Sequence, residues 1–501
     1  MSKFKRWMIL VIVSSALLLI VMDMTILYTA LPSLTHDLGA SASEKLWILN
    51  GYSLVMAGLL PAMGTLGDRL GHKKIFTLGL VVFSVASLAA AFSPVPAVLV
   101  MSRILLAVGA SMMMPATLSI IRVTFTNERE LALAIGIWGS IASGGAGLGP
   151  IVGGLLLQHF WWGSVFLINL PIAIIAFVFA LKMIPKHQGD TSKKWDFTSS
   201  IQIMIAMVGI IYSIKEFTRR EGSLTLAIIA AVIGVLSLII FIRRQNNSPN
   251  PLLDLSLFKI PRFSTGFITA LVGLFAQMGV QYMVTQRLQL VEGMSPLQAG
   301  LFTVSIPVAA LIAGPVTGAI MHRVDVVYIK SFTLFIAALG MGTYLMYFNA
   351  GFTGQIIGLA LLGAGLGSGM TAASHSIMSY APPHKAGMAA SIEEVGYELG
   401  GASGIAIIGS MSTLFYTLAM KIPAGISVPA NAKDSLDEAL IAAESLPAAS
   451  AESLKNAAFA AFDQSFFVVI AGVTVFLFIA ALIMSWVALR LKRAPKHSVK
   501  T

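Results

Sequence analysis

Long apolar runs alternate with short polar segments along almost the whole chain of 501 residues. A membrane-crossing helix needs about 20 mostly apolar residues, because the hydrocarbon core is about 30 Å thick. Segments that meet this requirement start near residues 8, 46, 75, 98, 131, 163, 198, 223, 263, 297, 330, 354, 388 and 464. The pattern therefore predicts an all-α integral membrane protein with fourteen spans.

The longest polar interruption lies between the last two spans, at about residues 420–463. Apolar residues recur there at helical spacing, stop at Pro447 and then resume. Ser435 and Glu438 have the spacing of a capping box at a helix start. We expect a short amphipathic helical hairpin, and the alternative is a plain tether.

The composition narrows the class of protein. The chain is 57% hydrophobic and only 11% charged, whereas soluble domains carry about 25% charged residues. This excludes a soluble enzyme, a nucleic-acid-binding protein and a disordered scaffold. The chain has no cysteine, and its histidines lack metal-ligand spacing. We therefore expect no disulfide, metal site or cofactor.

The basic residues indicate the orientation in the membrane. The net charge is +11, and most of the 33 Lys and Arg residues fall in loops on the side of both termini. Cationic loops collect on the cytoplasmic side, so both termini are predicted to be cytoplasmic. The positive charge then needs no polyanionic partner such as nucleic acid. The first apolar run lacks a cleavage site and is interpreted as an uncleaved span.

A weak internal repeat predicts the domain organisation. Gly64 and Arg69 follow span 2, and Gly318 and Arg323 repeat that spacing after span 10. Spans 5 and 13 are both rich in glycine, and each pair is eight spans apart. Repeated halves are typical of transporters. The predicted parts are a six-helix bundle (1–190, spans 1–6), inserted spans 7 and 8 with a linker (191–255), and a second six-helix bundle (256–501, spans 9–14).

Asp23 in span 1 and Arg103 in span 4 are charged residues within apolar runs. At 1.5 Å per residue, Asp23 lies about 24 Å from the cytoplasmic start and Arg103 about 9 Å from the outer start. Both are thus in the outer half of the membrane, where a charge costs at least about 2.5 kcal/mol. We expect the two side chains to pair, and we hypothesise that protonation of Asp23 loosens the pair.

Span 13 contains three acidic residues, Glu393, Glu394 and Glu398. Glu394 and Glu398 are four residues apart and share a helix face, and Glu398 lies about 16 Å deep. Such carboxylates must face a water-filled cavity, where they can exchange protons. For Glu393, a structural cap near the inner interface remains the alternative. With Arg103 as the one clear basic residue within the spans, the excess of acids predicts a cationic cargo.

The loop after span 2 carries a specific motif, composed of Gly64, Asp68, Arg69, Gly71, Lys73 and Lys74. Glycine permits a tight turn, and Asp68 and Arg69 can bridge helices or meet a helix dipole. The motif resembles the cytoplasmic signature of the major facilitator superfamily, with His72 at a position usually basic. The resemblance implies a conformational latch. A plain cationic loop would explain the lysines alone.

Span 5 contains the series Gly145, Gly149, Pro150, Gly153 and Gly154. Small residues let helices approach closely, and proline bends a helix. The series resembles the antiporter motif of proton-coupled exporters in the same superfamily. Ordinary glycine packing is the alternative.

Together with Asp23, Arg103 and the span-13 acids, these motifs resemble the fourteen-span drug/proton antiporters. The likeness is to quaternary-ammonium and methyl viologen resistance exporters, although Ala310 stands where some relatives are acidic. It implies a bacterial inner-membrane monomer that exports lipophilic mono- and dications in exchange for protons, with no cofactor. A proton-coupled transporter of an amino acid or sugar is the alternative, and an integral membrane enzyme is a remoter one.

Four aromatic residues are candidates to line the cargo cavity: Tyr397, Trp138, Tyr52 and Tyr282. A ring face attracts a lipophilic cation by about 0.5–2 kcal/mol. Each ring could equally be ordinary core or belong to the interface belt.

Overall fold

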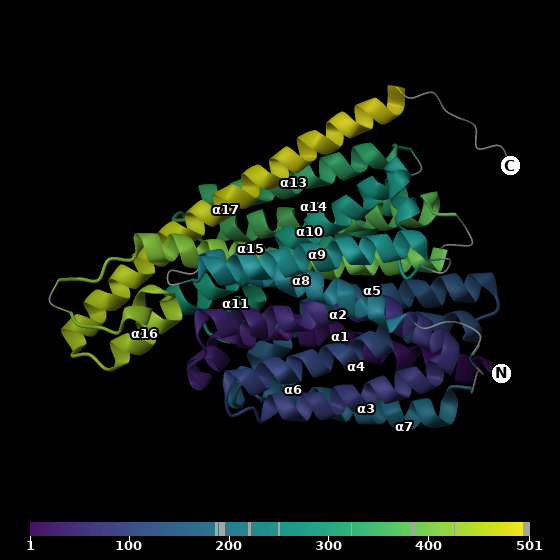
Figure 1. Cartoon of the computed structure of the whole chain (residues 1–501), viewed down its shortest axis with the longest axis horizontal. Coiled ribbons are helices and arrows are strands. Elements are labelled where there is room, and N and C mark those ends of the chain that lie inside the picture. Colours follow the sequence, from purple (N-terminus) through teal and green to yellow (C-terminus); the bar gives the residue numbers. More distant parts are fainter. Residues whose placement is uncertain are drawn as a thin grey trace. The chain divides into compact units, whose positions relative to one another are not determined.

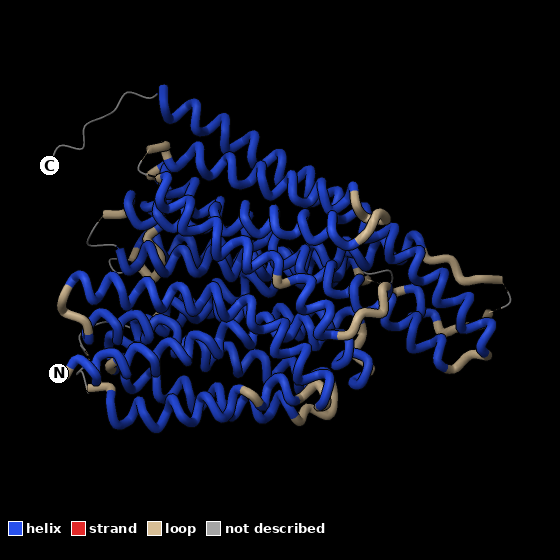
Figure 2. Tube along the Cα trace, turned by 180° about the vertical axis from the view of Figure 1, so that it is seen from behind, coloured by secondary structure: helices blue, strands red, loops and turns tan. Residues whose placement is uncertain are grey.

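A computed structural model describes residues 1–185, 189, 196–218, 222–248, 251–321, 323–382, 386–424 and 426–493. Within these ranges the elements are helices joined by short loops, and no strand occurs (Figure 2). Thirteen described helical segments are long and apolar enough to cross a membrane. Helix α5 (Glu128–His159), with 32 residues, brings them to the predicted number. The all-α membrane fold is confirmed.

The chain forms two compact units. The first consists of Met1–Leu255, Met278–Val304 and Gly401–Val469, and the second of Ser256–Gln277, Ser305–Gly400 and Ile470–Thr501. The boundary expected between residues 190 and 191 lies outside the described ranges.

The first unit contains most of the described helices, many of which are labelled in Figure 1. They are α1 (Lys3–Leu38), α2 (Ala42–Leu70), α3 (His72–Ala91), α4 (Pro96–Thr124), α5, α6 (Ser164–Leu167), α7 (Asn169–Met183), α8 (Phe197–Thr218), α9 (Leu224–Asn247), the π-helix η2 (Arg287–Val291), α11 (Pro296–Thr303), the 3-10 helix η4 (Ala430–Lys433) and α16 (Leu436–Glu444). Helix α4 packs on α2 and α3, α1 packs on α5, and α8 packs on α9 and α2. Ser41 and Glu44 form a capping box that starts α2.

The second unit is built around α14 (Phe352–Tyr380), which packs between α12 (Ser305–Ile320) and α13 (Val326–Met346). The 3-10 helix η1 (Leu255–Lys259) precedes α10 (Pro261–Gln286). Three described α-helices contribute residues to both units: α10, α15 (Ala386–Ala419) and α17 (Ala448–Arg493).

Helix α9 shows why an apolar surface dominates the composition. It exposes Ile228, Ile229, Val232, Ile233, Leu236 and Ile240. Only 17% of its most apolar stretch is buried within the protein. A helix that is apolar on all sides is suited to a lipid environment.

The predicted outer hairpin is confirmed in part. Its first helix is α16, whose start is capped by the Ser435 hydroxyl, which accepts a hydrogen bond from the Glu438 amide at 3.3 Å. The second helix is not separate, because α17 runs without interruption from Ala448 through the last span. The helix therefore begins before residue 464, where the apolar run of the last span starts. Pro447 precedes the first turn of α17, where its missing N–H is no handicap.

Candidate functional site

Asp23 on α1 and Arg103 on α4 form an ion pair in the first unit. The Asp23 side chain is fully buried, and that of Arg103 is 2% exposed. The contact between these two helices agrees with the depth calculated from the sequence. A pair removed from solvent needs further hydrogen bonds to offset the loss of hydration.

The second Asp23 oxygen is satisfied by Asn169 at the start of α7. The Asn169 amide donates to Asp23 Oδ1 at 3.1 Å and to the Ser87 hydroxyl on α3 at 3.2 Å. Sequence reasoning missed both residues. The sequence did contain a signal for Asn169, which is an amide within the largely apolar sixth span, two residues before Pro171.

The Arg103 guanidinium is held by α2 as well. Its Nε donates to the backbone oxygen of Ile48 at 3.3 Å. The Tyr52 ring lies 4.5 Å from the guanidinium carbon and is fully buried. Such a cation–π contact supports an arginine in a dry environment. Tyr52, an expected cargo ring, is thus in contact with Arg103.

The three glutamates of α15 belong to the second unit, whereas Asp23 belongs to the first. Glu393 and Glu398 are each 6% exposed, and Glu394 is partly exposed. The Tyr397 hydroxyl donates to Glu393 Oε1 at 2.6 Å. Tyr397 and Glu393 are therefore hydrogen-bonded neighbours, one helical turn apart.

The glycine series on α5 contacts two helices. Gly145, Gly149 and Gly153 face α1, where added Cβ atoms would press on Leu18, Thr25 and Ile26, respectively. Gly154 faces α11, and a Cβ there would overlap the backbone of Leu297. A Cβ on Gly300 of α11 would lie 2.5 Å from the Pro150 oxygen. The close helix approach that small residues predict is confirmed.

The motif between α2 and α3 forms a tight turn at Gly71, whose φ is +93°. Asp68 lies 3.2 Å from His72. The Lys73 ammonium donates to the Ile184 oxygen at 2.6 Å and thereby holds the end of α7. The other members are Gly64 and Arg69, which are partly buried, and Lys74, which is exposed.

The two remaining aromatic candidates also have partners. The Trp138 indole N–H donates to the Thr117 hydroxyl at 3.1 Å. Tyr282 is 8% exposed, and the Lys45 ammonium lies 5.8 Å from its ring centre.

Several buried basic residues escaped the sequence analysis. Lys45 at the start of α2 is 5% exposed and pairs with Asp437 of α16, while also donating to Gln286. Arg287 is 3% exposed and pairs at 2.8 Å with both Asp463 and Glu292. No sequence signal links these partners, which are up to 392 residues apart.

Lys330 corrects the expectation that Arg103 is the one basic residue within the spans. It lies in α13 and is fully buried, whereas the sequence placed it in a cytoplasmic loop. Its ammonium donates to the hydroxyls of Thr265 at 2.7 Å and Ser376 at 2.9 Å. These hydroxyls, from α10 and α14, provide the polar environment that the burial of a lysine requires.

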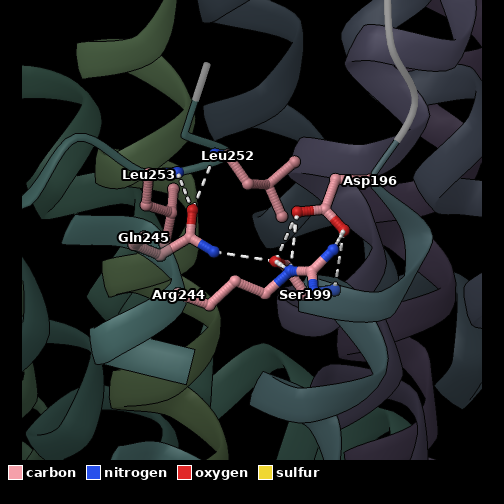
Figure 3. Close-up of polar contacts among 6 residues, drawn as sticks. All are labelled: Asp196, Ser199, Arg244, Gln245, Leu252 and Leu253. Carbon is pink, nitrogen blue, oxygen red and sulfur yellow. Dashed lines mark hydrogen bonds and ion pairs between the residues drawn. The ribbon is translucent and has the colours of Figure 1, made fainter. Parts of the chain in front are cut away.

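The inserted helices α8 and α9 are joined by a polar cluster (Figure 3). Arg244 pairs with Asp196 at 3.1 Å, and the Gln245 amide donates to Ser199 at 2.8 Å. Gln245 also accepts the Leu252 amide at 2.7 Å. Burial opposes the ionisation of Asp196, but hydrogen bonds from Arg244 and Ser199 outweigh it and lower the pKa of the carboxyl.

Comparison of the sequence with known proteins identifies the family to which this chain is similar. Residues 13–405 match the profile of the Major Facilitator Superfamily. The chain is 38% identical over 467 residues to the methyl viologen resistance protein SmvA of Salmonella typhimurium, covering 92% of this chain and 94% of the relative. It is 37% identical over 464 residues to the multidrug efflux pump LfrA of Mycolicibacterium smegmatis, covering 92% of each. The resemblance inferred from the motifs is confirmed.

A solved structure supports the fold independently. A bacterial homologue of the human lysosomal transporter Spinster, in an inward-facing and unoccupied conformation, superimposes with a TM-score of 0.65. The alignment covers 97% of this chain and 99% of the other, at 14% sequence identity. At that identity the likeness shows the fold alone.

Proposed function

Since the chain belongs to the major facilitator superfamily, we propose that it is a multidrug exporter that exchanges lipophilic cations for protons. The proposed cargo comprises quaternary ammonium antiseptics, dyes and viologens. The observation that carries the proposal is the set of intramembrane carboxylates on α15, two of which are only 6% exposed. The names of the two relatives, a methyl viologen resistance protein and a multidrug efflux pump, support the same cargo class.

In the proposed cycle, cation and proton compete for Glu398 and its neighbours. A cation bound from the cytoplasm is released outside when protons neutralise the carboxylates. The protonated protein returns inward and loses its protons to the cytoplasm. The low dielectric constant of the site strengthens this competition. An ionised carboxylate without a counter-charge has a high free energy there, so it binds either a cation or a proton.

The pair of Asp23 and Arg103 supplies a second protonatable element in this proposal. While the pair is intact, Arg103 is held between Asp23, the Ile48 oxygen and the Tyr52 ring. Protonation of Asp23 removes the Coulomb attraction and leaves the guanidinium with neutral partners. The pair thereby links a proton to the packing of α1 against α4.

The membrane potential contributes to the driving force. It acts with about 2.3 kcal/mol per elementary charge and 100 mV, so export needs net inward charge movement. A dication therefore requires more protons per cycle than a monocation. This scheme places a monomer in the bacterial inner membrane with both termini in the cytoplasm, as the distribution of basic loops favours.

The test is uptake of ethidium or dequalinium into everted membrane vesicles, with and without an imposed proton gradient. We expect gradient-dependent uptake for the wild type and loss of uptake to background for Glu398→Gln. Glu452→Gln removes an exposed carboxylate on α17 and should leave uptake unchanged. Undiminished uptake by Glu398→Gln, or uptake that ignores the gradient, would refute the proposal.

A further inference from the structure

A cavity of about 200 Å³ lies between α2, α8, the last turns of α15 and the outer hairpin, defined as η4, α16 and the α17 residues up to Phe462. All of its lining residues belong to the first unit. It is separate from the glutamate site, because Ser410 on its wall follows Glu398 by twelve residues of one helix, which is about 18 Å at 1.5 Å per residue.

The charges on the wall favour a cation. The hairpin contributes the carboxylates of Asp434 and Glu438, and α8 contributes one ammonium, Lys215. The Lys215 ammonium is held at the wall, where it donates to the Ser43 oxygen at 3.0 Å and lies 5.0 Å from the Trp47 ring centre. With all three groups ionised, the lining has an excess of negative charge.

The α15 side of the cavity is lined with hydroxyls. Ser410, Thr413 and Thr417 lie on one face of the helix, since they are three and seven residues apart. Ser410 is 2% exposed, and its hydroxyl has no hydrogen-bond partner among the described residues. An unsatisfied hydroxyl in a buried position costs about 1–3 kcal/mol. A polar ligand in the cavity would remove that cost.

The size and composition of the cavity select the kind of cation. Among the described residues no group of three or more acidic or histidine side chains could hold a metal ion, and this wall also presents the apolar side chains of Ala42 and Leu46. Pockets for drug-sized ligands measure about 300–1,000 Å³, and this cavity is smaller. It suits a compact ammonium group whose methyl groups contact apolar surface.

We propose that this cavity is a second binding site, which holds the ammonium head group of the exported cation after it leaves the α15 glutamates. The inference rests on the proposed function for the identity of the cargo. Asp434 and Glu438 provide the attraction, Ser410 provides an oxygen ligand, and Lys215 opposes binding. The affinity of the site for a cation therefore depends on both its negatively and its positively charged side chains.

The direct test is equilibrium binding of tetramethylammonium to the purified full-length protein, measured by saturation-transfer NMR. The Glu398→Gln background removes the central site from the measurement. We expect saturable binding to persist there and to weaken at least about tenfold with Asp434→Asn and Glu438→Gln combined. Lys215→Gln should change the affinity in the opposite direction. Glu452→Gln, which removes a charge on α17 away from the cavity, is the matched control.

Ser410→Leu tests the site without changing charge, because it fills the cavity and removes the hydroxyl. It should abolish the same binding. Unchanged binding in both the acid variant and Ser410→Leu would overturn the inference, as would equal weakening by Glu452→Gln.

A transport measurement separates this inference from the proposed function. In right-side-out vesicles, external tetramethylammonium should slow ethidium export by the wild type, and the half-inhibitory concentration should rise about tenfold in the acid variant. Export that is driven by protons but is equally inhibited in both proteins refutes the outer site alone. Binding that depends on Asp434 and Glu438 in a protein that exports no cation refutes the proposed function alone.

Discussion

Replacing Asp23 with asparagine isolates the contribution of a single buried negative charge. The substitution preserves the size of the side chain and its contact with Asn169, which can reorient its amide. It leaves the Arg103 guanidinium, 2% exposed, with one backbone oxygen and the Tyr52 ring as the partners that the structure provides. The expected effect is therefore a loss of stability, independent of any effect on transport.

The magnitude follows from the burial of both partners. Removing one member of a buried ion pair costs about 3–5 kcal/mol, because the other charge remains without compensation. The chain offers a partly exposed pair for comparison, Arg6 and Glu130, at 2.9 Å with side chains 25% and 27% exposed. Breaking an exposed pair costs about 0–1 kcal/mol, so Glu130→Gln is the control.

The assay is the free energy of unfolding in mixed detergent micelles with an increasing fraction of SDS. We expect Asp23→Asn to unfold at a much lower SDS fraction than Glu130→Gln. The double variant Asp23→Leu with Arg103→Met should recover most of the loss, since apolar residues of similar volume can replace a buried pair. That double variant should nevertheless lack proton-coupled export. Equal stabilities of Asp23→Asn and Glu130→Gln would refute the reasoning.

Two further substitutions test other parts of the structure. Gly154→Ala places a Cβ against the Leu297 backbone and should cost about 1–3 kcal/mol through overpacking, whereas Gly318→Ala, with nothing within 4 Å of its Cβ, should be neutral in the same unfolding assay. Arg244→Gln should lower stability by at most about 1 kcal/mol at pH 7. Because the pKa of Asp196 is lowered from its ordinary 3.8, this difference should be complete above that value and decline as the pH falls through the lowered pKa, and a difference that does not decline in acid would contradict the assignment.

The sequence alone predicted most of the architecture, for a physical reason. A backbone in lipid must satisfy its own hydrogen bonds, so every long apolar run becomes a helix. The same constraint made Asp23 and Arg103 conspicuous, because a charge at that depth requires a partner. The role of the glycines of α5 could also be predicted, since a series of residues without side chains on one helix predicts the close approach of a second helix.

The buried basic residues near the helix ends were not predictable in this way. Lys45, Arg287 and Lys330 lie near the ends of hydrophobic runs, where a cation ordinarily faces water or lipid head groups. Their burial depends on partners brought together by tertiary packing, such as Asp437 for Lys45. Hydropathy contains no information about such long-range pairs. Pro447 does lie between α16 and α17, as predicted, but the hydropathy change near residue 464 does not show that the second hairpin helix continues without interruption into the last span.

Helix α15 belongs to both compact units, and the division falls between Gly400 and Gly401. A helix transmits force along its axis because its hydrogen bonds lie in that direction, but it bends readily where small residues such as glycine adjoin. The paired glycines stand two residues beyond Glu398. A bend at this glycine pair would therefore change the direction of the arm that carries Glu398 relative to the arm that carries Ser410.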